Sequence, residues 1–112
     1  NGGMYLLEEM LRGADGAMTG FAYPEMMAQV VDAMTVGDEA RARDTFDAYL
    51  PMIRYEAQPG LGLAIRKYSL AKRGAIAHPT LRKPGAALSA RACGEVDILA
   101  QRQIARLADL GL

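Results

Sequence analysis

The side chains best suited to chemistry are few in this 112-residue chain, and they lie far apart in the sequence. His78 is the only histidine, so no histidine pair can bind a metal, and no Ser-His-Asp combination is convincing. We interpret His78, which precedes a proline in a polar stretch, as an exposed loop residue. Cys93 is the only cysteine. It falls near the start of a predicted helix, a position that can activate a thiol, but we interpret it as an ordinary helix residue.

Glycines and acidic residues add candidates without completing a site. Gly60 and Gly62 resemble half of a phosphate-binding loop, but no strand precedes them, and we expect them to accommodate the start of a helix. Glu8, Glu9 and Glu39 are predicted on helix surfaces, where we do not expect a paired general acid and base. Taken by themselves, these residues form no complete active site and no metal site.

A basic stretch lies in the middle of the chain, where Arg66, Lys67, Lys72 and Arg73 are close in sequence. Arg66 and Arg73 fall on one side of the helix predicted there. We interpret that side as a solvated face or a subunit contact before any phosphate site.

The composition is that of an ordinary soluble domain, with 51% hydrophobic and 23% charged residues. With a formal net charge of zero, nothing in the composition suggests a general binder of nucleic acid or of anionic membranes. No apolar run approaches the roughly 18 residues of a membrane-spanning helix, and no signal peptide is expected. We interpret the start at Asn1, without an initiator methionine, as a sign of truncation. A single cysteine fits a reducing compartment, so we expect a cytoplasmic protein.

The first third of the chain reads as helix, strand and helix. Good helix formers over residues 4–12 predict the first helix, and small residues alternating with Met18 and Phe21 predict a short buried strand over 16–22. Pro24 then suits the first turn of a helix that runs to about residue 36, with Met27, Val30, Val31 and Met34 facing inward. No other segment resembles a strand, so this one has no partner in its own sequence.

Everything after Gly37 reads as helix. We expect helices over about 39–56, with Asp38 as its N-cap, over about 61–73, and over about 89–109, with Ser89 as a possible cap. Pro51 falls inside the first of these and should kink it or remove a backbone hydrogen bond. The expected chain is mainly α-helical, with about five helices and one short strand. The helix–strand–helix order near the start is typical of a parallel α/β fold.

Several short pieces of the sequence match one family in the right order and over essentially the whole chain. They are residues 7–20, Gly37 and Asp38 followed by Ala40 and Ala42, residues 49–53, residues 56–59, Lys67 with Gly74, and residues 81–84. The chain resembles the C-terminal part of the dihydrodipicolinate synthase / N-acetylneuraminate lyase family, which are pyruvate-type class I aldolases on a TIM barrel with a helical extension.

The resemblance implies a division of the chain into two parts. Residues 1–37 would be the last part of a TIM barrel, with outer helix 7, strand 8 and helix 8, and residues 38–112 a three-helix C-terminal extension. The neighbours of the lone strand would lie outside this chain. An isolated piece should expose the apolar faces of residues 4–36 unless the missing N-terminal barrel segment or a second copy covers them.

The family's chemistry, as the resemblance implies it, uses a lysine on the sixth strand that forms a Schiff base with a 2-oxo acid. That lysine would lie upstream of this chain, because Lys67, Lys72 and Lys83 do not match its position. We therefore expect no catalytic residue and no separate cofactor in this chain, and a fragment that is inactive alone. The expected partners are the small 2-oxo acid and further copies in a homo-oligomer, a dimer or tetramer, with no nucleic acid and no membrane.

Six residues of this chain match positions that border the substrate in the family. They are Asn1, Gly2, Gly3, Met18, Thr19 and Gly20. The first three match the loop after strand seven, and the others match strand eight, where active sites of this fold gather. The two namesake enzymes carry acidic residues where Gly2 and Gly3 stand here, so we favour a sugar-acid aldolase or dehydratase. The alternative is an autonomous helical oligomerisation or interaction module without catalysis.

Overall fold

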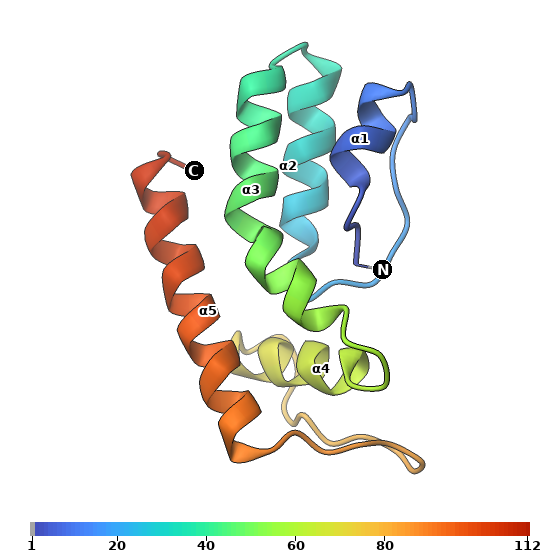
Figure 1. Cartoon of the computed structure of the whole chain (residues 1–112), viewed down its shortest axis with the longest axis vertical. Coiled ribbons are helices and arrows are strands. Elements are labelled where there is room, and N and C mark those ends of the chain that lie inside the picture. The colour runs from blue at the N-terminus through green and yellow to red at the C-terminus, as the bar shows by residue number, and fades with distance from the viewer. Residues whose placement is uncertain (1) are drawn as a thin grey trace.

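A computed structural model describes residues 2–112, which form five α-helices. These are α1 (Leu6–Leu11), α2 (Pro24–Thr35), α3 (Glu39–Glu56), α4 (Gly62–Lys72) and α5 (Ala90–Asp109). Figure 1 shows α1, α2 and α3 arranged next to one another, with α5 along the outside of α3. The shorter α4 lies across one end of α3, and the loop after it returns to the start of α5. All five expected helices are present, and each has bounds within two residues of its prediction.

The antiparallel pair α2 and α3 forms the centre of the core. Pro24 begins α2, and the carboxylate of Asp38 accepts a hydrogen bond of 3.1 Å from the backbone N–H of Arg41, as predicted for an N-cap. The buried residues of α2 are Met26, Val30 and Ala33, so the predicted inward position of Val30 is confirmed. Met27, Val31 and Met34, which were predicted with it, are only half-buried, because the buried face is rotated by about one residue around α2.

The two other long helices follow the sequence in most respects. Pro51 lies within α3, which continues unbroken to Glu56, with the proline on the exposed side. The hydroxyl of Ser89 caps α5 by accepting a 3.1 Å hydrogen bond from the backbone N–H of Ala92. Val96 is the best-buried apolar residue of α5, whereas Ile98 and Ile104 are exposed. Only part of the apolar surface of α5 therefore covers the core.

The predicted strand over residues 16–22 is wrong, because no strand is found within residues 2–112. A strand needs the backbone of a neighbour to complete its ladder of hydrogen bonds, and this chain supplies none. The segment instead returns from the end of α1 to the start of α2 as an irregular trace (Figure 1).

The expected boundary at Gly37 stays a prediction. In this chain a single apolar core includes residues from both sides of it, among them Leu6, Val30, Phe46 and Ile65. Among the described residues no helix is both long enough and apolar enough to cross a membrane.

Candidate functional site

Four of the six residues predicted to border the substrate lie together. The backbone N–H of Gly2 donates a 3.2 Å hydrogen bond to the hydroxyl oxygen of Thr19, and a methyl placed on Gly2 or Gly3 would contact Gly20 or Thr19. Gly2 and Gly3 have φ angles of +67° and +82°, which favour glycine. The turn before α1 is thus held against residues 19–20. Asn1 lies outside the described residues.

Met18 is separated from this group, because its side chain is 98% exposed. Met18 was predicted in a buried strand, and its exposure in this chain contradicts that prediction. No described side chain covers that of Met18.

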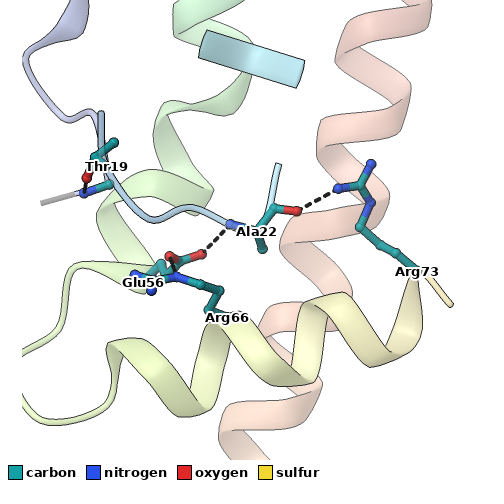
Figure 2. A network of polar contacts seen from close by, with 6 residues as sticks. Thr19, Ala22, Glu56, Arg66 and Arg73 are labelled. Carbon is teal, nitrogen blue, oxygen red and sulfur yellow. Dashed lines mark hydrogen bonds and ion pairs between the residues drawn. The ribbon is translucent and has the colours of Figure 1, made fainter. Parts of the chain in front are cut away.

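The backbone of Ala22 is held on both sides by charged side chains from distant helices (Figure 2). Its N–H donates a 3.1 Å hydrogen bond to Oε2 of Glu56 at the end of α3. Its carbonyl oxygen accepts a 2.6 Å hydrogen bond from Nη1 of Arg73, which follows α4. These two contacts take the place of the hydrogen bonds that a neighbouring strand would make, and they fix the end of the segment that we expected to be strand eight.

Arg73 also joins this segment to the first turn of α2. Its guanidinium lies 4.4 Å from the ring centre of Tyr23 and pairs with the carboxylate of Glu25. The rings of Phe21 and Tyr23 pack in turn against Tyr49 of α3. Burial raises the pKa of Tyr23, and the nearby Arg73 opposes the increase. Residues 21–23 are consequently anchored by both aromatic and ionic contacts.

Glu56 is a buried carboxylate with two partners. It is 3% exposed, and its Oε1 accepts a 2.8 Å hydrogen bond from Nε of Arg66 in α4. Burial raises the pKa of Glu56, while the hydrogen bonds from Arg66 and from the Ala22 N–H act in the opposite direction. Glu56 therefore links three segments: the end of α3, the first half of α4 and the backbone before α2.

The guanidinium of Arg66 lies directly over Gly20. A Cβ atom added to Gly20 would stand 2.5 Å from Nη1 of Arg66 and 2.7 Å from its Cζ, which is too close for any real contact. Nη1 and Nη2 have no hydrogen-bond partner among residues 2–112. Arg66 also lines a cavity of about 240 Å³ together with Gly2, Glu56, Gln58 and the glycines before α4. The cavity therefore lies between Gly2 and Arg66, whose Nη1 and Nη2 are available as hydrogen-bond donors.

A larger cavity of about 490 Å³ lies elsewhere, between α4, the start of α5 and the loop that joins them. Cys93 and Tyr68 line it, and the Tyr68 hydroxyl donates to the carboxylate of Asp97 at 2.9 Å. Burial and the Asp97 carboxylate raise the pKa of Tyr68 to about 12. His78 is exposed in the loop, as expected. Within residues 2–112, no three histidine, cysteine or acidic residues are grouped as metal ligands.

Sequence reasoning missed the roles of Glu56, Arg66 and Arg73. The two arginines do lie on one side of the basic stretch, as predicted, and both contact residues 20–25 while remaining partly exposed to solvent. The sequence contained one sign of these contacts. Arg66 and Arg73 share one face of a helix, and the preceding helix ends in a single acidic residue, Glu56. Gly62 begins α4, in agreement with the expectation that the paired glycines accommodate a helix start.

The chain is similar to parts of two known proteins. No protein-family model matches the chain. The chain is 35% identical over 81 residues to an L-2-keto-3-deoxyarabonate dehydratase from Azospirillum brasilense, a match that covers 70% of this chain and 25% of that enzyme. It also matches the crystal structure of a dihydrodipicolinate synthase from Rhodopseudomonas palustris with a TM-score of 0.88 and 51% identity.

The structural match covers 90% of this chain but only 34% of the crystallised chain. This chain therefore spans about a quarter to a third of the length of the proteins that it matches. Both relatives support the resemblance that the short matching pieces indicated.

Proposed function

We infer that this chain, the C-terminal part of a dihydrodipicolinate synthase family protein, belongs to a lyase that forms a Schiff base with pyruvate or a related 2-oxo acid. The observation that carries the proposal is the match to a dihydrodipicolinate synthase at 51% identity over 90% of the chain. In such a reaction a lysine amine condenses with the 2-oxo carbonyl and releases water, and the resulting iminium ion accepts electrons from the bond that breaks.

This chain would supply one edge of the substrate site rather than its reactive groups. The Gly2–Thr19 hydrogen bond holds the turn before α1 against Gly20, and neither glycine places a side chain in the space beside it. An open edge of this kind suits a substrate that extends beyond pyruvate. We therefore propose a sugar acid as the substrate, and the relative named L-2-keto-3-deoxyarabonate dehydratase supports that class.

We propose that the Schiff-base lysine lies outside this chain and that the chain alone is inactive. Lys67 donates a 3.1 Å hydrogen bond to the Thr80 carbonyl, Lys72 lies near the Tyr68 ring, and Lys83 is in the exposed loop. None of the three lines the cavity that contains Gly2 and Arg66. No separate cofactor is needed, since the lysine itself forms the covalent intermediate.

The exposed apolar side chains near the start of the chain support a further part of the proposal. Met18 and Tyr5 are exposed on a segment that we assign to the end of a barrel, so we propose that the remaining barrel strands cover them. We also propose a homo-oligomer, a dimer or tetramer, and a cytoplasmic location, the latter because a single cysteine suits a reducing compartment.

The test is borohydride trapping followed by intact mass measurement, on this chain and on the full-length enzyme that contains it. With pyruvate and borohydride, the full-length enzyme should gain the mass of one reduced pyruvyl group per subunit, and this chain should gain none. An adduct on Lys67, Lys72 or Lys83 would contradict the assignment of the lysine. Absence of any adduct on the full-length enzyme would contradict the proposed chemistry.

The alternative function is a helical oligomerisation or interaction module without catalysis. The specific observation in its favour is that α2, α3, α4 and α5 share a core that needs no strand. Such a module would form the same oligomer whether or not pyruvate is trapped, and its full-length form would gain no adduct. The same experiment therefore separates the two functions.

A further inference from the structure

The guanidinium of Arg66 occupies the place where a side chain on Gly20 would be. A Cβ on Gly20 would lie between 2.5 and 3.0 Å from three atoms of the guanidinium. Gly20 does not have a positive φ, so its backbone would accept another residue. Any larger residue at this position would therefore have to displace the guanidinium of Arg66.

Gly20 lies between the exposed and the buried parts of the segment. Met18 is exposed, while Phe21, Ala22 and Tyr23 are buried in the helical core, and Gly20 itself is half-buried. Arg66 of α4 therefore reaches the point at which the segment enters the core, next to residues predicted to border the substrate.

Glu56 fixes the orientation of Arg66 and leaves two of its nitrogens available. The Glu56 carboxylate binds Nε, so the opposite edge of the guanidinium, with Nη1 and Nη2, is directed away from it. That edge has no partner among residues 2–112, and the Arg66 side chain is 32% exposed. The 240 Å³ cavity beside it is lined by Gly2, one of the residues predicted to border the substrate.

We propose that Arg66 is a specificity-determining residue that binds oxygen atoms at the distal end of the 2-oxo acid through Nη1 and Nη2. A guanidinium presents two parallel donors that match a carboxylate or a pair of neighbouring hydroxyls. A site built to bind such oxygens rejects analogues without them, because its donors are then left unpaired. This inference rests on the proposed function and adds to it the residue that selects the substrate.

Matched 2-oxo acids provide the test in the full-length enzyme. Three acids have five carbons and differ only at the distal end: 2-oxopentanoate is apolar, 2-keto-3-deoxyarabonate carries hydroxyls, and 2-oxoglutarate carries a carboxylate. Pyruvate lacks a distal end altogether. The quantity measured is the concentration of each acid that gives half-maximal borohydride-trapped adduct.

The substitution Arg66→Lys retains a positive charge for Glu56 but removes the two-donor edge. It should raise the half-maximal concentration of one oxygen-bearing acid by about tenfold to a hundredfold relative to 2-oxopentanoate. A change confined to 2-keto-3-deoxyarabonate would identify hydroxyls, and a change confined to 2-oxoglutarate would identify a carboxylate. Arg43→Lys, at an exposed ion pair with Glu39, is the matched control and should change none of the four values.

A second variant acts on the same contact without removing the arginine. Gly20→Ala should displace the guanidinium and cause the same selective loss as Arg66→Lys. Equal changes for 2-oxopentanoate and the oxygen-bearing acids, in both variants, would overturn the inference while leaving the proposed function intact. Absence of a pyruvate adduct in the unaltered enzyme would instead overturn the proposed function, and this inference with it.

Discussion

The α2–α3 pair and the segment of residues 14–23 satisfy their backbone groups in opposite ways. Each helix of the pair makes its own hydrogen bonds, and Asp38 supplies a cap from the adjoining turn. In the segment, the backbone of Ala22 depends on the side chains of Glu56 and Arg73, both more than 30 residues away in the sequence. Helices can therefore form from local signals, whereas an extended segment with no neighbouring strand is positioned by the side chains that bind its backbone.

The largest expected effect lies in the α2–α3 pair. Phe46 of α3 is buried in the core, and Phe46→Ala should lower the free energy of unfolding by about 3–5 kcal/mol because it leaves a cavity. Urea denaturation followed by far-ultraviolet circular dichroism measures the loss. Val36→Ala, at an exposed position after α2, is the control and should stay within about 0.5 kcal/mol of the unaltered chain. A similar small loss for Phe46→Ala would show that the pair does not hold the core.

A smaller and more local effect is expected at Glu56. Glu56→Ala leaves the buried N–H of Ala22 and the Nε of Arg66 without their acceptor, which should cost about 2–3 kcal/mol. Amide hydrogen exchange should show lost protection at Ala22 with little change in α2. Glu56→Gln retains an acceptor oxygen and should preserve protection at Ala22. If Glu56→Ala leaves that amide protected, the segment is held by other contacts.

The caps of the helices should matter less than this long-range contact. Asp38→Ala removes the acceptor of the Arg41 N–H and should lower the free energy of unfolding by about 1 kcal/mol. Ser89→Ala should have a similar effect on α5. Urea denaturation measures both effects. If Asp38→Ala lowered the free energy of unfolding as much as Glu56→Ala does, the local cap and the long-range contact would be equally important.

The smallest expected effect is a dependence of the free energy of unfolding on pH that Glu56 should cause. Because the folded pKa of Glu56 is raised above 4.5, the folded chain binds this proton more tightly than the unfolded chain. The resulting stability is present below the unfolded pKa and is lost as pH rises through the folded pKa. The free energy of unfolding of the unaltered chain, relative to Glu56→Gln, should therefore fall as pH rises from below 4.5. A constant difference across that range would contradict the raised pKa.

Much of the fold could be predicted because its signals are local. The caps at Asp38 and Ser89 and the proline at the start of α2 act on adjacent residues, and they predicted three helices closely. The exact buried face of α2 could not be predicted, since it depends on how α3 packs against it. Of the candidate site, the proximity of Gly2, Thr19 and Gly20 followed from the family resemblance, and the exposure of Met18 did not.

The sequence by itself determined the helices and their order. It did so because helix hydrogen bonds join residues four apart. Only the tertiary structure decided that Glu56 and Arg73 hold Ala22 from both sides and that Arg66 lies over Gly20. Those contacts join residues far apart in the chain, and they depend on the angle at which α4 crosses the end of α3, which no local pattern encodes.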